Sequence, residues 1–399
     1  MRVLLIHSFW HPRGGDTTSL QIQREALQAR GHDVVAFGMR HPDNVPEPGD
    51  AAWPGWRDAQ PWGVASALWS RAAARALCRV LRAAPVDVAH VHHLHRHLTL
   101  SVLPVLAAAR VPVVWTLHDY EWSCPTGRHY RAGAPCFACT PDTLLPALRH
   151  GCTRGLERPV PVESAMLVAE KRIHRVLRPE RDVAAFIAPS RFLAEQVRGV
   201  LPGARLVHLP NPVLLPPSSE LQRRGVVFAS RFVEEKGVDE TITLAAAFPE
   251  TSFTLLGDGP LLASVRARRL PNVAAPGAVP REAVGAALLR AQAVLVPSRW
   301  PENDPYAVTE AQAAGAVVLA SSIGGIPEQI DDGRDGLLCP AGAVTGWIAP
   351  LRQILGDPAL AAQIGDRARA RIARERDPVA TAIALEELYN SLRFPGASP

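Results

Sequence analysis

The sequence predicts an α/β protein made of two parallel-sheet domains, each built from short strands that alternate with helices. The chain has 399 residues, which exceeds the usual size of one domain and suits two. Short apolar runs alternate with helical patterns from the N-terminus onward, and the alternation restarts after a Pro- and Ser-rich stretch at 214–224. Apolar residues make up 47% of the chain, which is enough for a core in each half.

The Pro- and Ser-rich stretch sets the predicted domain boundaries. We expect a first domain over residues 1–213, a second over 214–376 and a final amphipathic helix over 377–399. The apolar run at 3–6 is too short for a signal peptide, and no run reaches the length of a membrane span. The sequence therefore predicts a cytoplasmic protein.

The charge of the chain is uneven. Residues 1–213 carry 25 Lys and Arg against 17 Asp and Glu, whereas the whole chain has a net charge of +5. A basic first domain suits anionic partners, including peripheral contact with a membrane surface, but solvated arginine-rich helix faces explain it equally well. Nucleic acid is not expected as a partner, because no nucleic-acid-binding module is recognisable. Only Lys171 and Lys236 are lysines, and lysine offers phosphate a compact point charge that arginine does not.

The first strand–loop–helix unit carries a glycine pair. A strand is predicted at 3–6, a turn around Gly14 and Gly15, and a helix from Thr17 to Arg30. Glycines in this position allow the backbone to come close to a ligand. The alternative is a tight turn that needs a positive φ. The GxGxxG fingerprint of dinucleotide binding is missing.

Histidines follow two predicted strands of the first domain. The strand at 86–91 ends in a dense run of them, and the strand at 111–117 delivers His118 and Asp119 at its carboxyl end, where open α/β sheets bind ligands. The run contains no carboxylate or cysteine, so one or two active-site imidazoles are favoured over a metal site. Its members are His90, His92, His93, His95 and His97.

Four cysteines lie in one loop after His118, namely Cys124, Cys136, Cys139 and Cys152. One CxxC pair with two flanking cysteines suits a four-thiolate zinc knuckle. Reduced structural thiols are the competing interpretation, and disulfides are not expected in a cytoplasmic protein.

The second domain contains two motifs that suit a sugar nucleotide. Arg231 and Lys236 lie between a strand end and a helix start, a natural place for phosphate. Glu302 lies in the loop before a helix that begins near Tyr306, where it can reach sugar hydroxyls. Glu310 lies just over one turn into that helix, where it can accept hydrogen bonds from a ribose. Taken alone, the two carboxylates could also be a loop charge and a solvated helix residue.

Together these motifs resemble the retaining glycosyltransferases of family 4, which have the GT-B fold. The resemblance implies two Rossmann-like domains that face across a cleft, the first binding the acceptor and the second the nucleotide sugar. It also implies that the C-terminal helix crosses back to the first domain. The matching pieces, in chain order, are Gly14-Gly15, GHDV, HVHHLHRHL, TLHDYEWSCP with the cysteine loop, APSRF, LPNPV, SRFVEEKGVD, GDGP, PENDPYAVTEAQAAG and GGIPEQI.

The resemblance also implies roles for single residues. His118 would lie against the sugar and the acceptor, and Glu302 would contact sugar hydroxyls, so both are expected at the catalytic centre. The ribose would be bound by Glu310 and the diphosphate by the Arg231 and Lys236 side chains. The expected donor-binding residues are Gly15, Arg231, Lys236, Tyr306, Ala307, Val308 and Glu310.

The chain departs from the family pattern at two places. Ala229 stands where many members have a glycine, and Asp304-Pro305 where many have an aromatic residue and a glycine. We interpret the second departure as substrate tuning.

The implied reaction moves a sugar from a nucleotide-diphosphate sugar to an acceptor hydroxyl with retention of configuration. The acceptor would be a sugar, a lipid-linked molecule or a small molecule, in polysaccharide, glycolipid or glycoside biosynthesis. No cofactor or metal is expected, because the chain has no DxD motif and Arg231, Lys236 and helix N-termini can stabilise the leaving diphosphate. The alternatives are a nucleotide-sugar epimerase on the same fold and a non-catalytic nucleotide-sugar-binding paralogue.

Overall fold

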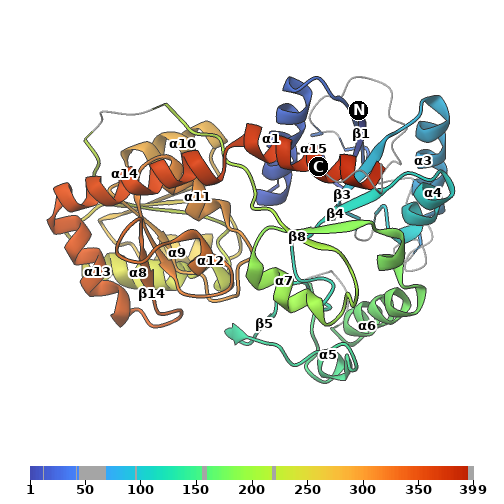
Figure 1. Cartoon of the computed structure of the whole chain (residues 1–399). Coiled ribbons are helices and arrows are strands. Elements are labelled where there is room, and N and C mark those ends of the chain that lie inside the picture. Colours follow the sequence, from blue (N-terminus) through green and yellow to red (C-terminus); the bar gives the residue numbers. More distant parts are fainter. Residues whose placement is uncertain are drawn as a thin grey trace. The chain divides into compact units, whose positions relative to one another are not determined.

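A computed structural model describes residues 1–11, 13–41, 43–44, 69–94, 97–154, 160–217 and 222–393. The chain forms two compact units, each with a six-stranded parallel sheet (Figure 1). The predicted α/β class with two parallel sheets is therefore confirmed. Unit 1 comprises Met1–Gly127, Phe137–Pro212 and Pro378–Pro399, and unit 2 comprises Arg128–Cys136 and Val213–Asp377.

The sheet of unit 1 has the strand order β2-β1-β3-β4-β7-β8. Its strands are β1 (Arg2–His7), β2 (Asp33–Phe37), β3 (Val88–His93), β4 (Val113–Thr116), β7 (Ala185–Ala188) and β8 (Leu206–His208). The helices of this unit are α1 (Gly15–Ala29), α3 (Arg71–Ala83), α4 (Leu103–Ala108), α5 (Leu145–Arg149), α6 (Val160–Leu177), α7 (Arg191–Arg198) and α15 (Pro378–Arg393), with short 3-10 turns at Leu100–Val102 and Pro179–Asp182.

Both faces of the unit 1 sheet are covered, which explains why its strands are apolar throughout rather than alternating. In β1, Leu4 and Ile6 pack toward α3, whereas Val3 and Leu5 pack toward α1 and α15. Helix α15 therefore completes the core of unit 1, although it is the last helix of the chain. Figure 1 shows α15 in red beside α1 in blue.

The sheet of unit 2 has the order β11-β10-β9-β12-β13-β14. Its strands are β9 (Val226–Ala229), β10 (Phe253–Leu256), β11 (Val273–Gly277), β12 (Ala293–Val296), β13 (Val317–Ser321) and β14 (Leu337–Cys339). Its helices are α8 (Val238–Ala247), α9 (Leu262–Ala267), α10 (Arg281–Arg290), α11 (Tyr306–Ala313), α12 (Ile326–Gln329), α13 (Thr345–Gly356) and α14 (Pro358–Glu375), with a 3-10 turn η3 at Glu234–Lys236.

Alternate residues of each central strand in unit 2 serve two separate cores. In β13, Val317 and Leu319 pack with α8, α13 and α14, while Val318 and Ala320 pack with α10, α11 and α12. This arrangement places α11 on one face of the sheet and directs its first turn to the carboxyl ends of β9 and β12.

Two local features differ from the sequence prediction. Strand β3 continues to His93, so His92 and His93 lie on the strand rather than after it. The cysteine loop contains a short antiparallel hairpin, β5 (Tyr130–Arg131) with β6 (Ala134–Pro135), that was not predicted. His95 lies outside the described residues. Within the described ranges, no helix has the length and apolarity to cross a bilayer.

Candidate functional site

The loops after β9 and β12 come together at the carboxyl edge of the unit 2 sheet. Lys236 lies on η3, and its Nζ is 2.6 Å from Oε1 of Glu302, which lies in the loop after β12. The hydroxyl of Ser298 donates to the same oxygen at 2.6 Å. Because Glu302 is only 5% exposed, this pair is shielded from bulk water and holds the carboxylate in one place. The structure thus brings together two of the predicted site residues.

Close backbone packing fixes Lys236. The next residue, Gly237, has a φ of 73°, and a Cβ added to it would lie 2.0 Å from the carbonyl oxygen of Pro297. A side chain at this position would therefore separate the two loops. Nζ of Lys236 also lies 5.0 Å from the centroid of the Trp300 ring, within the range of a cation–π contact.

Glu310 lies on α11 and pairs with Arg281 at the start of α10. The guanidinium of Arg281 is 2.7 Å from Oε1 of Glu310. Burial raises the pKa of Glu310, and the charge of Arg281 lowers it in part. Arg281 thus adds a cation beside the predicted ribose-binding carboxylate, which the sequence analysis missed because 29 residues separate the two.

The remaining predicted residues of unit 2 surround this edge of the sheet. Arg231 follows β9 and is exposed. Tyr306, Ala307 and Val308 form the first turn of α11, where helical N–H groups lie outside the i to i−4 ladder. The side chains of Tyr306 and Val308 are buried, so these residues can offer a ligand only their backbone.

In unit 1, the predicted residues His118 and Gly15 lie near one carboxylate, that of Asp16. Gly15 begins α1, and Gly14 has the extended φ of 175°. Neither glycine lies in the left-handed region, so the alternative of a turn that needs such a φ is wrong. Burial raises the pKa of Asp16, but the hydrogen bond with His7 at 3.3 Å and the charges of His7 and His118 outweigh burial and hold this pKa well below its usual value. Asp16 is therefore an anion between the two predicted residues. His7 was not predicted.

His118 is held by one of the clustered histidines. Its Nε2 lies 2.9 Å from Nδ1 of His92, and the two rings are stacked. Burial, together with neighbouring His90 and His118, holds the pKa of His92 well below its usual value, so His92 is neutral. His90 is bound on both sides, by the hydroxyls of Tyr389 at 2.6 Å and Thr116 at 2.7 Å. His90 is thus a hydrogen-bonded core residue, whereas His92 contacts and orients His118.

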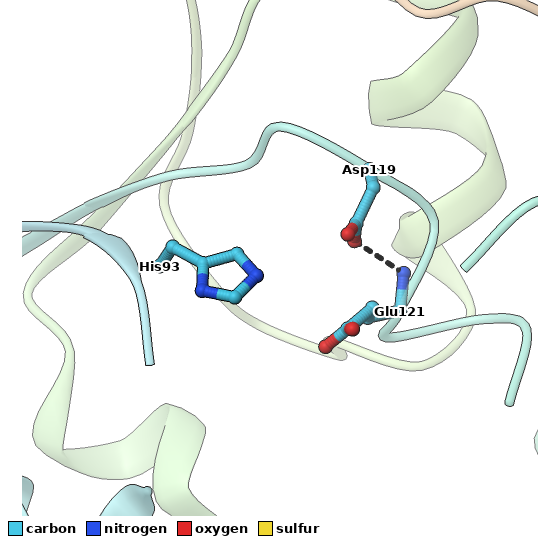
Figure 2. A group of neighbouring side chains, drawn as sticks. All are labelled: His93, Asp119 and Glu121. Atoms are coloured by element: carbon cyan, nitrogen blue, oxygen red, sulfur yellow. Dashed lines mark hydrogen bonds between the residues drawn. The ribbon is translucent and has the colours of Figure 1, made fainter. Parts of the chain in front are cut away.

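His93, Asp119 and Glu121 form a further cluster in unit 1. Their ligand atoms lie within 4.8 Å of one another, and Figure 2 shows the His93 ring directed toward the two carboxylates. Glu121 forms an ion pair with Arg154, and Nζ of Lys171 lies 3.9 Å from its second oxygen. A cation at this position would compete with the two side chains that already neutralise Glu121. The cluster is therefore better described as a buried ion-pair network.

The four loop cysteines do not form a zinc knuckle. In the part of the chain that the structure describes, the group at His93 is the only one with three or more ligands at metal-binding distance, and none of the four thiols forms a disulfide. Cys139 and Cys152 pack against the apolar cluster of Leu144, Ala147 and Val168. The interpretation as reduced structural thiols is the one that fits.

The two parallel α/β units, with polar loops at the carboxyl ends of their strands, define a protein of the GT-B fold class. A model of "Glycosyltransferase Family 4" matches residues 13–215, and one of "Glycosyl transferases group 1" matches 217–371. The chain belongs to glycosyltransferase family 4, as the resemblance implied.

Curated relatives are similar over parts of the chain. Glycogen synthase of Mycobacterium tuberculosis (strain CDC 1551 / Oshkosh) is 30% identical over 175 residues, which cover 41% of this chain and 42% of that protein. The chain thus spans less than half the length of this relative. N-acetyl-alpha-D-glucosaminyl L-malate synthase of Bacillus anthracis is 23% identical and is matched over 75% of this chain and 74% of its own length.

Solved structures share the fold along nearly the whole chain. Sucrose-phosphate synthase from Thermosynechococcus elongatus superimposes with a TM-score of 0.71 at 17% identity, covering 98% of both chains. Anabaena Alr3699/HepE, in complex with UDP and glucose, superimposes with a TM-score of 0.68 at 18% identity, covering 98% of this chain and all of the other.

Proposed function

We propose that this chain transfers a glycosyl group from a nucleotide-diphosphate sugar to an acceptor hydroxyl, with retention of configuration and without a metal ion. The observation that carries the proposal is the ion pair of Lys236 with the buried Glu302, with Glu310 eight residues further along. In this arrangement Lys236 binds the diphosphate, Glu302 the sugar hydroxyls and Glu310 the ribose. All three lie in unit 2, which is the proposed donor-binding domain, as residues 214–376 were expected to be.

The proposed transfer reaction requires positive charge at the leaving group. The bond from the anomeric carbon to the phosphate oxygen breaks, and the diphosphate departs with the electron pair. The acceptor oxygen attacks the same face of the anomeric carbon and passes its proton to a phosphate oxygen. Arg231, Lys236 and the first turn of α11 around Ala307 supply fixed positive charge and N–H donors for the diphosphate, which is why no metal is proposed.

Unit 1 is proposed to bind the acceptor, with His118 beside the reacting groups and Gly15 approaching the donor phosphate through its backbone. The similar proteins named above act on different acceptors, so the class of acceptor remains open among sugars, lipid-linked molecules and small molecules. Peripheral membrane contact and a cytoplasmic location stay predictions. Support for membrane contact comes from exposed apolar side chains at α5 and the start of α6, namely Leu145, Leu148, Val160 and Val162.

The test is a donor screen followed by product analysis. UDP-, GDP-, ADP- and dTDP-sugars are compared by thermal shift, beginning with UDP-glucose, with which HepE was crystallised. A bound donor raises the unfolding temperature by mass action. The stabilising donor is then incubated with candidate acceptors, and NMR reports the anomeric configuration of the product.

Each outcome of this test separates the proposal from its rivals. Retention in the product and unchanged turnover in EDTA are the expected results. An inverted product or activity lost in EDTA contradicts the mechanism. An epimerised sugar nucleotide without transfer identifies an epimerase, and binding without any turnover identifies a non-catalytic paralogue.

A further inference from the structure

The loop that carries Glu302 also contains a buried acid, Asp304. Its side chain is 2% exposed, so it does not face a ligand. Oδ1 accepts a hydrogen bond from Nε2 of Gln329 at 2.6 Å, and Oδ2 accepts one from the guanidinium of Arg376 at 2.8 Å. Both oxygens are thus bound within unit 2. The residue by which the chain departs from the family pattern at this position therefore contacts other residues of the protein.

Arg376 is itself held by the backbone. It caps the C-terminus of α14, where its N–H donates to the carbonyl of Ile372 at 2.9 Å. Its own carbonyl accepts from the N–H of Val213 at 2.9 Å. Val213 begins the main segment of unit 2, and Asp377 ends it. The cation that binds Asp304 therefore lies where the chain enters and leaves this unit.

Gln329 is held as firmly on the other side. It is the last residue of α12, and its carbonyl accepts from the Gln312 amide at 2.9 Å and from the Arg371 guanidinium at 3.0 Å. Gln312 lies on α11, two residues after Glu310. Asp304 thus joins the donor loop to α11, α12 and α14 through three fixed side chains.

The backbone of Glu302 is held by a second, independent contact. Gly325 donates its N–H to the carbonyl of Glu302 at 2.7 Å. Gly324 has a φ of 61°, and a Cβ there would lie 2.3 Å from the same carbonyl oxygen. The loop is therefore fixed at Glu302 by backbone packing and two residues later by the buried Asp304 carboxylate.

We propose that Asp304 and Arg376 are positioning residues that hold the Glu302 carboxylate where it meets the donor sugar. The inference rests on the proposed function of Glu302. Removing one partner breaks the buried ion pair and leaves the other charge in a site shielded from water, so the loop must shift to bring that charge to water. The shift moves Glu302, while Arg231 and Glu310, on other elements, still bind the nucleotide.

The test compares a sugar nucleotide with the corresponding nucleoside diphosphate, by titration calorimetry on the full chain. We expect Asp304→Asn and Arg376→Met each to weaken binding of the sugar nucleotide about tenfold and binding of the diphosphate less than about twofold. The double variant should be no weaker than the worse single one, because both changes remove the same interaction. Arg376→Lys, which keeps the charge, should recover most of the loss.

The matched control is Arg369→Met. Arg369 lies on the same helix, α14, and donates to the backbone carbonyls of Ala313 and Pro216, away from the donor loop. Its loss should lower stability without changing the ratio of the two affinities. If Arg369→Met and Asp304→Asn change that ratio equally, or Asp304→Asn leaves it unchanged, the inference is overturned.

Amide hydrogen exchange separates this inference from the proposed function. Without any ligand, Asp304→Asn should speed exchange of residues 302–304 about tenfold relative to the wild type, and Arg369→Met should not. Unchanged exchange in Asp304→Asn overturns the positioning role even if the wild type binds donor. If exchange is faster in Asp304→Asn but the wild type binds no sugar nucleotide, the positioning role of Asp304 is supported and the proposed function is rejected instead.

Discussion

Lys236 shows why a lysine persists in a chain that otherwise uses arginine. Its ammonium fits between the Glu302 carboxylate at 2.6 Å and the face of Trp300, and a planar guanidinium would not occupy that space in the same way. A donor that binds must exchange the ion pair for its own contacts. In the function proposed above, the diphosphate then binds Lys236, and sugar hydroxyls bind Glu302.

The pairing of His92 with His118 indicates which tautomer His92 adopts. His92 is neutral, and its Nε2 is buried without a hydrogen-bond partner among the described residues. A buried N–H without an acceptor is rarer than a buried acceptor without a donor. The proton of His92 is therefore on Nδ1, which donates to Nε2 of His118.

This geometry predicts a kinetic effect of His92. His92→Phe removes one hydrogen bond to His118, so the transfer rate should fall by roughly 2–10-fold, while donor affinity, which depends on unit 2, should change little. His92→Asn, whose amide can replace the Nδ1 donor, should restore much of the rate.

His118→Ala should reduce transfer more than donor binding. Equal losses of rate and affinity in these variants would contradict the placement of His118 at the reacting groups.

At the scale of elements, α15 is attached to unit 1 by its core and by several polar contacts, including those of Tyr389 with His90 and of Glu386 with Arg30. Leu385 and Tyr389 pack in the core that α1 and β1 share. Glu386 accepts from the Arg30 guanidinium at 2.8 Å and lies 2.7 Å from Nε2 of His32. The Arg30 hydrogen bond, against the opposing effect of burial and with help from His32, lowers the pKa of Glu386 to about 2.

The lowered pKa makes the attachment of α15 sensitive to acid. A carboxylate whose pKa is depressed on folding stabilises the folded state above its ordinary pKa, here 4.5, and loses that stabilisation as pH falls toward about 2. The wild type should therefore be more stable than Glu386→Gln at pH 7, and the difference in unfolding temperature should shrink between pH 4.5 and about 2. Glu387→Gln, on the exposed face of α15, is the control. A difference that is the same at every pH would contradict this assignment.

The elements were predictable because their signals are local. The strand at 226–229 and the helix at 306–313 each follow from apolar runs, periodicity and flanking turn residues. The β5–β6 hairpin was missed because its strands have two residues each, too few for a pattern. The cysteines suggested zinc because spacing in sequence does not report where thiols point. The structure packs Cys139 and Cys152 into an apolar cluster.

At the scale of the whole molecule, the site residues named from the sequence fall into two groups, one on each unit. Lys236 and Glu302 are paired in unit 2, which also carries Glu310, while Gly15 and His118 share a neighbour in unit 1. Their motifs could be found because each is contiguous. The residues that hold them could not be found: the partner of Asp304 is 72 residues away, and nothing in the local sequence distinguishes this buried acid from an exposed one.

The most direct test of the account is calorimetric titration of the wild type and Lys236→Ala with the donor that the screen identifies. Lys236→Ala should weaken binding of the donor by about 1.5–3 kcal/mol, the value of a charge-assisted hydrogen bond. It should weaken binding of the nucleoside diphosphate by as much as binding of the sugar nucleotide. Thermal unfolding in parallel confirms that the variant is folded. Equal donor affinity of the folded variant and the wild type would contradict the claim that the Lys236–Glu302 pair is the donor site.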